Sequence, residues 1–560
     1  MTAPTPVVAA ATTAHDDAGD RPGERHASGR TTARDAHGSD TVAAHAARRR
    51  SIAVISHPDA GKSTLTEALA LHAHVISEAG AVHGKAGRAG VVSDWLEMEQ
   101  ERGISITSAA LQFTFHDVVI NLVDTPGHAD FSEDTYRVLT AVDAAVMLLD
   151  AAKGLEPQTL KLFAVCRRRG IPIIAFINKW DRPGREALEL CDELEKIGLR
   201  PTPITWPVGE SGNFRGLLDC RTDEVIVYQR APGGSTLAIE EHLTLDEARG
   251  RLPLDVQDAV ESSALLGGFD VEGFRAGTSC PLLFGAALSN IGVQQLLDVI
   301  AELAPAPSAR LDVHDVPREV AAPFSGFVFK MQAGMDRNHR DHVAFLRVCS
   351  GQFERGMIVT HAPSGRAFAT KYALSVFGRD RETIEVAYPG DIVGLVNAGT
   401  LAVGDTVYSP DGPAVEFPPM PIFAPEHFIA ARVRDPGRSK QFRRGIAQLE
   451  QEGVVQVLVS DLRGNAAPIL AAVGPLQFEV ATYRMEHEFN AVMRSERLNL
   501  SIARLATPED VATLAGAQGV ELVRRADGTT LALLTDVWRL RSLQRAHPEL
   551  VLAPLLADVP

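Results

Sequence analysis

The fold of this chain is decided at residues 56–63, where the sequence reads Ser56-His57-Pro58-Asp59-Ala60-Gly61-Lys62-Ser63. The short apolar run 51–55 precedes this stretch, and residues 64–71 after it carry apolar side chains at helical spacing. We therefore expect a loop between a β-strand and an α-helix. The backbone N–H groups of such a loop converge at the positive end of the helix dipole, where they can bind the β- and γ-phosphates of a nucleotide.

Two side chains at the end of this loop have the chemistry that a nucleoside triphosphate requires. Lys62 is expected to reach the phosphates, and the hydroxyl group of Ser63 is expected to bind Mg²⁺. Ser56, however, stands at the first position of the loop, where the general phosphate-loop pattern has Gly. The stretch by itself could also be an ordinary glycine turn that opens a helix, so further motifs must decide between the two interpretations.

Three further motifs follow apolar runs and complete a guanine-nucleotide pattern. They are Asp124-Thr125-Pro126-Gly127, Asn178-Lys179-Trp180-Asp181 and Gly285-Ala286-Ala287. Asp124 can hold Mg²⁺ through water, and the backbone N–H of Gly127 can meet a γ-phosphate. The carboxylate of Asp181 can accept hydrogen bonds from N1–H and the N2 amino group of guanine, which adenine lacks. The backbone of residues 285–287 can contact guanine O6.

Each of these motifs also has a less specific interpretation. Asp-Thr-Pro-Gly is a common turn composition, Asn-Lys-Trp-Asp could be a solvated loop, and Gly-Ala-Ala alone carries little information. All four motifs nevertheless occur in the required order, each after a predicted strand. Since open parallel sheets bind ligands at the carboxyl ends of their strands, the sequence predicts one site for GTP or GDP with Mg²⁺.

The hydrophobic pattern predicts an α/β P-loop GTPase domain, followed by an all-β barrel and an α+β C-terminal domain. Apolar runs at 111–115, 118–123, 144–149 and 171–177, with a helical segment at 157–169, indicate a parallel sheet covered on both faces. Short glycine-punctuated strands between 324 and 408 indicate a closed barrel. A cap-like Ser439 is expected to begin a helix in the last domain.

The predicted domain boundaries follow from these changes of pattern. They are a disordered leader at 1–47, a GTP-binding domain at 48–305 with an insert at about 208–277, a β-barrel domain at 306–415 and an α+β domain at 416–560. The leader lacks apolar periodicity, and its acidic residues argue against an organelle transit peptide.

Composition excludes several classes of protein. The 560 residues carry a formal net charge of −16, which argues against a protein that coats nucleic acid. The five cysteines are widely scattered and lack the spacing of a zinc site or a disulfide framework. The sequence contains no uninterrupted apolar run of about 18 residues and no secretory signal pattern. We therefore predict a cytoplasmic protein without membrane contact, and we expect a monomer.

The segment Arg102-Gly103-Ile104-Ser105-Ile106-Thr107 and the sequence Asp124-Thr125-Pro126-Gly127-His128 resemble the switch segments of translational GTPases, the group of elongation factor G. Within that group, Ser-His-Pro-Asp-Ala-Gly-Lys at 56–62, Ser105, and Asn-Lys-Trp-Asp-Arg-Pro-Gly at 178–184 resemble the bacterial peptide chain release factor three family most closely. The resemblance covers about residues 48–500, and its motifs are highly specific.

The resemblance implies roles for two further residues. Ser105 matches the switch position that binds Mg²⁺ while the γ-phosphate is present, with Thr107 as the second choice. His128 matches the histidine that orients the attacking water, although without the resemblance a surface histidine beside Asp130 is an equal interpretation. The implied partners are the ribosome, through its RNA and proteins, and codon-reading release factors. The alternatives are an elongation factor G-like translocase and a ribosome-binding GTPase of the protection or assembly type.

Overall fold

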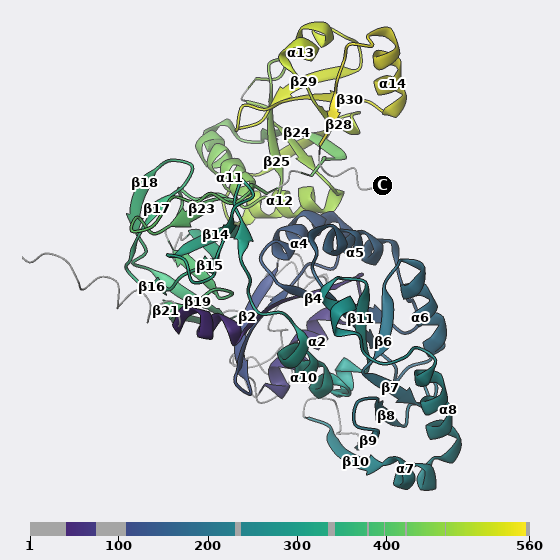
Figure 1. Cartoon of the computed structure of the whole chain (residues 1–560). Coiled ribbons are helices and arrows are strands. Elements are labelled where there is room, and N and C mark those ends of the chain that lie inside the picture. The colour runs from purple at the N-terminus through teal and green to yellow at the C-terminus, as the bar shows by residue number, and fades with distance from the viewer. Residues whose placement is uncertain are drawn as a thin grey trace, which may run out of the picture.

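The computed structural model describes residues 41–73, 108–229, 237–333, 342–377, 380–396, 398–420, 423–464 and 466–555. The described chain forms an α/β domain, a barrel-like β domain and a C-terminal α+β domain, arranged side by side (Figure 1). One boundary of the prediction is wrong, because residues 41–47, which were assigned to the disordered leader, are helical. Val42 and Ala46 of this helix are buried, so it belongs to the folded part of the chain.

The α/β domain is built on a seven-stranded sheet with the strand order β2-β3-β1-β4-β5-β11-β6. The strands are β1 (Arg49–Ser56), β2 (Ala109–Phe115), β3 (Val118–Asp124), β4 (Ala144–Asp150), β5 (Ile173–Asn178), β6 (Arg200–Pro203) and β11 (Ser279–Phe284). Only the edge strand β2 is antiparallel to its neighbour, and the other pairs are parallel. The carboxyl ends of the parallel strands therefore share one edge of the sheet.

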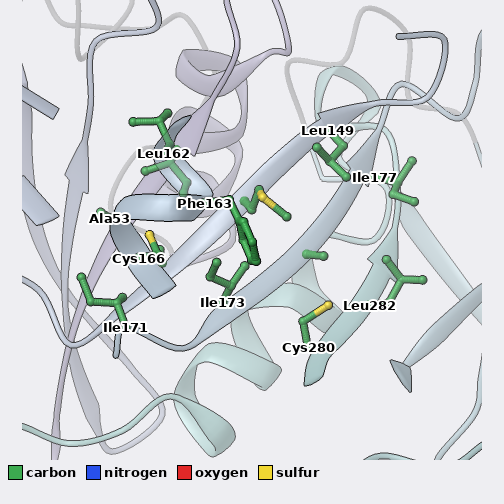
Figure 2. Packing of buried hydrophobic residues seen from close by; sticks show 14 of the residues in the cluster. Ala53, Leu149, Leu162, Phe163, Cys166, Ile171, Ile173, Ile177, Cys280 and Leu282 are labelled. Carbon is green, nitrogen blue, oxygen red and sulfur yellow. The ribbon is translucent and has the colours of Figure 1, made fainter. Parts of the chain in front are cut away.

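Both faces of this sheet are covered by helices, as the sequence predicted. Successive residues of β1 alternate between two apolar clusters, with Ala53 and Ile55 in one and Ile52 and Val54 in the other. The first cluster includes side chains of α4 (Ser132–Leu139), α5 (Pro157–Arg169) and α6 (Ala187–Lys196), and Figure 2 shows α5 packed over the strands. The second includes side chains of α2 (Lys62–His72) and α10 (Val293–Leu303).

The insert between β6 and β11 forms a layer of its own. Its four strands pair antiparallel in the order β10-β9-β8-β7, and three helices follow them. These elements are β7 (Thr205–Val208), β8 (Gly216–Asp219), β9 (Glu224–Gln229), β10 (Ile239–Thr244), α7 (Leu245–Arg251), α8 (Pro253–Ala264) and α9 (Val271–Arg275). The insert lies beyond α10, at one end of the α/β domain (Figure 1).

The β domain contains an eight-stranded sheet in the order β18-β17-β23-β14-β15-β22-β19-β20. The strands are β14 (Ser325–Ala333), β15 (His342–Ser350), β17 (Ile358–His361), β18 (Arg366–Ala369), β19 (Ala373–Phe377), β20 (Asp380–Thr383), β22 (Ile392–Val396) and β23 (Thr406–Tyr408), with β16 (Phe353–Glu354) and β21 (Val386–Ala387) as a separate pair. In the described part of the chain β18 and β20 do not pair with each other, so the sheet is barrel-like rather than closed.

The C-terminal domain is α+β, as predicted, with an eight-stranded sheet in the order β27-β24-β26-β25-β29-β30-β28-β31. Its elements are β24 (His427–Val433), α11 (Ser439–Gln451), β25 (Gln456–Ser460), β26 (Ile469–Ala472), α12 (Pro475–His487), β27 (Met493–Arg497), β28 (Ile502–Leu505), α13 (Pro508–Leu514), β29 (Val520–Arg524), β30 (Thr530–Leu534), α14 (Val537–Ala546) and β31 (Ala553–Pro554). The N-cap of α11 is Arg438, so the prediction of Ser439 as a capping residue is wrong. The Ser439 hydroxyl instead donates to the carbonyl of Pro436 at 2.6 Å.

The five cysteines are free thiols, which agrees with the prediction that they form no disulfide framework. Burial raises the pKa of the Cys166, Cys191 and Cys220 thiols to about 12, so these three cysteines remain protonated at neutral pH. None of the helices that the structure describes is both long and apolar enough to cross a bilayer.

Candidate functional site

The four predicted nucleotide motifs lie at the same edge of the seven-stranded sheet. They follow the carboxyl ends of β1, β3, β5 and β11, which are parallel neighbours or separated by one strand. The loop after β1 leads directly into α2, whose N-cap Gly61 has the left-handed backbone angle φ 96°. A residue with a side chain is strained in this conformation, so the glycine is required for the loop to turn into the helix.

Gly127 lies against the same loop from the other side. A Cβ atom at this position would lie 2.9 Å from Nζ of Lys62 and 3.6 Å from Cα of Pro58. Lys62 and Gly127, which are far apart in the sequence, therefore meet where the sequence predicts the γ-phosphate. The space beside the Lys62 ammonium depends on Gly127, because any side chain there would fill it.

Asn178, at the end of β5, connects two of the other motifs. Its Nδ2 donates to the carbonyl of Ala60 at 2.8 Å, and its Oδ1 accepts from the backbone N–H of Ala287 at 2.8 Å. Asn178 is 2% exposed, so both hydrogen bonds are shielded from water. The structure thus assigns to this amide a bracing role between the phosphate loop and the loop after β11, which the sequence pattern did not reveal.

Lys179 is held by a residue that the sequence analysis missed. Its Nζ contacts Oδ2 of Asp150 at 2.8 Å and also donates to the backbone carbonyl of Asp59. Burial alone would raise the pKa of Asp150, but the hydrogen bonds from Lys179 and from the Ala152 N–H lower it overall. Asp150 ends strand β4, and a carboxylate at the carboxyl end of an apolar strand was the signal that could have identified it.

Trp180 and Asp181 have different environments although they are adjacent. Trp180 is 2% exposed and packs edge to face on Phe284, with ring centroids 4.9 Å apart. Its indole is part of the core, so only its backbone is available to a ligand. Asp181 is partly exposed, and no hydrogen bond or ion pair holds its carboxylate within the described ranges. Its side chain is therefore available for the guanine contact that the sequence predicts.

The motif after β3 is anchored to the strand beside it. Asp124 is 2% exposed and lies opposite Val54 in the pairing of β3 with β1, and the Thr125 hydroxyl donates to the Val54 carbonyl at 2.7 Å. The carbonyl of Pro126 accepts from the Thr135 hydroxyl at 3.3 Å. These contacts place the Asp124 carboxylate next to the strand that leads into the phosphate loop.

His128 begins the 3₁₀ helix η1 (Ala129–Phe131), and its side chain is 35% exposed. Its Nδ1 accepts from the backbone N–H of Asp130 at 3.2 Å and lies 3.2 Å from Oδ1 of the same residue. The imidazole is thus next to Asp130, as the surface interpretation expected, and it is also on the loop that carries Gly127.

Two other residues of the phosphate loop have inward-facing side chains. The Ser56 hydroxyl is buried and donates to the carbonyl of His57 at 2.9 Å. His57 is also buried, with Nδ1 3.5 Å from the Thr159 hydroxyl of α5, and burial lowers its pKa. His57 is therefore neutral at pH 7, and its side chain lies between the phosphate loop and α5. The predicted contacts of Ser56 and His57 with GTP are left to their backbone atoms.

The predicted metal ligands are only partly described. Ser63 lies in the first turn of α2 and Asp124 lies at the end of β3, on adjacent strand–loop connections. Ser105 and its alternative Thr107 lie outside the described residues. Over the described ranges no group of three or more His, Cys, Asp or Glu side chains could hold a metal ion. A hydroxyl and a single carboxylate suit Mg²⁺ bound mainly through phosphate oxygens and water.

Comparison with known proteins identifies the class to which this fold and site belong. Residues 47–306 match the family model of the Elongation factor Tu GTP binding domain, and residues 323–410 match Elongation factor G domain 2. The crystal structure of a Thermus thermophilus protein has the same fold, with a TM-score of 0.65 over 80% of this chain and 67% of that chain at 22% identity. The chain is therefore a translational GTPase, with the predicted order of an α/β domain, a β domain that is barrel-like, and an α+β domain.

Residues 417–544 match the family model of the Class II release factor RF3, C-terminal domain. Peptide chain release factor 3 of Gloeobacter violaceus is 46% identical over 521 residues, covering 91% of this chain and 98% of that protein. The protein of the same name from Synechococcus elongatus is 46% identical over 524 residues, covering 91% of this chain and 94% of that protein. The chain belongs to the peptide chain release factor 3 family, a family of GTP-binding proteins of translation termination.

Proposed function

We propose that this chain hydrolyses GTP when the ribosome stimulates it, and that it thereby promotes the departure of codon-reading release factors after peptide release. The main support is the meeting of the nucleotide motifs at one sheet edge, with Asn178 hydrogen-bonded to two of the other loops. The release factor C-terminal domain on the same chain supports the termination role. The protein would act in the cytoplasm, as a monomer that binds the ribosome transiently.

GTP hydrolysis needs an attacking water in line with the γ-phosphate and compensation of the charge that spreads over the phosphates. We assign phosphate binding to Lys62, to the backbone N–H of Gly127 and to the backbone N–H groups of the loop at 56–63, in which Pro58 has none. Asp181 and the backbone of residues 285–287 would select guanine. Ser63 and Ser105, with Asp124 acting through water, would hold Mg²⁺, which neutralises negative charge on the phosphates. His128 would orient the attacking water.

A recycling assay tests this proposal. Ribosomes that carry a codon-reading release factor after peptide release would be mixed with the protein and GTP, and turnover of that factor would be measured. We expect GTP to speed turnover, and we expect the Lys62→Ala variant to give no acceleration because it cannot hold the phosphates. Turnover that is equally slow with and without the intact protein and GTP would contradict the termination role.

The alternatives predict other outcomes of the same assay. A translocase would move transfer RNA and messenger RNA on an elongating ribosome and leave release factor turnover unchanged. A protection or assembly GTPase would bind the ribosome in the presence of GTP without either effect. The match of residues 417–544 to a release factor C-terminal domain favours the termination role over both.

A further inference from the structure

A cavity of about 390 Å³ lies between the α/β domain and the β domain. It is lined by the segment between α4 and β4, by β14 and β15, and by residues 308–311 and 418–420, which precede and follow the β domain. Strand β14 lies against α4 in this region (Figure 1). Cavities of this size hold small organic ligands, and such ligands often bind between domains.

This cavity is separate from the predicted nucleotide site. The nucleotide motifs follow the carboxyl ends of the parallel strands, whereas Val142 and Asp143, which line the cavity, precede the amino end of β4. Strand β4 spans seven residues, so at about 3.3 Å per residue its two ends are roughly 20 Å apart. A small ligand in the cavity therefore does not contact a nucleotide bound at the loops.

The charged side chains of the cavity do not balance. Three arginines, Arg169, Arg310 and Arg347, and one aspartate, Asp143, line it, which gives a net charge of +2. Asp143 compensates Arg347, because both of its oxygens lie 2.7 Å from Nη2 of that arginine. The Cys349 thiol adds no negative charge, since burial raises its pKa. The cavity is thus positive although the whole chain has a formal net charge of −16.

Arg310 is the cavity arginine that most clearly lacks a counter-charge. Its Nη1 donates to the Thr140 carbonyl at 3.0 Å, and its guanidinium carbon lies 4.1 Å from the ring centroid of Phe327. In the parts of the chain that the structure describes, no carboxylate forms an ion pair with it. Burial, and then the charges of Arg347 and Arg169, lower its pKa, but a guanidinium stays charged at neutral pH. A bound anion would compensate this charge and use the remaining N–H donors.

We propose that the cavity is a binding site for a small phosphorylated compound, with a phosphate group held by Arg310 and Arg347. A phosphate group carries a charge of about −1.5 to −2 at neutral pH, which matches the charge of the cavity, whereas a carboxylate carries only −1. The planar fork of an arginine can donate two parallel N–H bonds to phosphate oxygens. Because segments on both sides of the β domain line the cavity, the bound phosphate also holds this domain against the α/β domain.

The test uses inorganic pyrophosphate as the probe. The intact chain is kept in saturating GDP and Mg²⁺, so that the phosphate loop is occupied, with the same free Mg²⁺ in the probe solution. Titration calorimetry measures binding of the probe, and a fluorescent GDP analogue reports displacement from the phosphate loop. We expect one saturable site, no displacement of the analogue, and a higher Tm in the presence of the probe.

Two variants locate the binding. Arg310→Met keeps an unbranched side chain beside Phe327 but removes the charge, so it should weaken the Kd for pyrophosphate by at least about tenfold. Ser308→Phe changes no charge, and its ring should fill the cavity and abolish binding, because Ser308 is exposed and lines the cavity. Arg444→Met is the matched control, since it removes the same charge from an exposed position on α11, and it should leave the Kd unchanged.

Three outcomes would overturn the inference. They are no saturable binding to the intact chain, an unchanged Kd in both cavity variants, and displacement of the GDP analogue over the concentration range in which the probe binds. If Arg310→Met folds poorly, Ser308→Phe decides by itself. None of these outcomes bears on the termination role, which the recycling assay tests separately.

Discussion

At the scale of single residues, His128 lies on the loop that brings Gly127 to Lys62, and its side chain contacts Asp130 and Phe131 of η1, with no hydrogen bond or ion pair to the phosphate loop at 56–63. We therefore predict that His128→Ala leaves GTP affinity within about twofold of the intact chain. Ribosome-stimulated hydrolysis should fall by about 100-fold or more, since an unoriented water reacts slowly. Nucleotide-binding fluorescence and single-turnover hydrolysis measure the two quantities. An equal loss of both would instead indicate a role in binding.

Asp181 gives a prediction about nucleotide choice. Its carboxylate is partly exposed and is not engaged by other described residues, so its replacement should disturb the fold little. We expect Asp181→Asn to shift preference from GTP toward xanthosine triphosphate, because the amide can donate to the oxygen that replaces the N2 amino group. Competition binding with both nucleotides checks this. Retention of the wild-type preference would show that another residue reads guanine.

The sequence could identify the residues of the site but not the orientation of their side chains. The motif placed Trp180 among the nucleotide contacts, whereas its indole packs on Phe284 in the core. Asp150, in contrast, belongs to none of the motifs, but the fold brings its carboxylate into contact with Lys179 in the site. Spacing along the chain specifies which loops meet, but the direction of a side chain depends on strands and helices from distant parts of the sequence.

At the scale of elements, the helices and strands with strong local signals were predictable. Helix α5 spans Pro157–Arg169, as predicted, because Pro157 occupies its first turn and Gly170 ends it in the left-handed conformation, φ 66°. The helix at 41–47 was missed because it carries no such local signal and is held by a distant part of the chain. His45 stacks on Tyr388 of the β domain at a ring-centroid distance of 3.9 Å, and no local pattern signals such a distant partner.

Asn178 provides a test of how separate loops are braced into one site. Asn178→Ala removes two hydrogen bonds and leaves the Ala60 carbonyl and the Ala287 N–H unsatisfied in a buried place. Each lost bond should cost about 1 to 3 kcal/mol. We therefore expect a lower melting temperature together with weaker binding of both GDP and GTP, measured by thermal unfolding with and without nucleotide.

Asn178→Asp is the informative companion to this variant. It keeps an acceptor for the Ala287 N–H but loses the donor to the Ala60 carbonyl. The aspartate variant should be destabilised because a buried carboxylate would face a carbonyl oxygen. If both variants bound nucleotide normally and melted as the intact chain does, the bracing role of Asn178 would be refuted.

At the scale of the whole molecule, the α/β and β domains are joined by a buried ion pair. Nη2 of Arg347 in β15 lies 2.7 Å from each carboxylate oxygen of Asp143, which precedes β4. The exposed fractions of the two side chains are 7% and 13%. The residues are 204 positions apart, so their meeting could not be predicted from the sequence. The contact depends on how the α/β domain and the β domain pack against each other.

This pair should matter more for docking of the two domains than for the fold of either one. Asp143→Asn leaves the Arg347 guanidinium buried without its counter-charge, which should cost about 3 to 5 kcal/mol in the free energy of unfolding. Replacing both partners, as Asp143→Leu with Arg347→Met, should recover much of that loss because no buried charge remains. Urea unfolding measures the free energy of unfolding of the single and the double variant, and calorimetry provides a second measurement.

Arg524→Met is the matched control, since the Arg524–Asp461 pair is exposed and should contribute less than about 1 kcal/mol. A loss for Asp143→Asn as small as that of the control would show that the domains are held together by their apolar contacts and not by this ion pair.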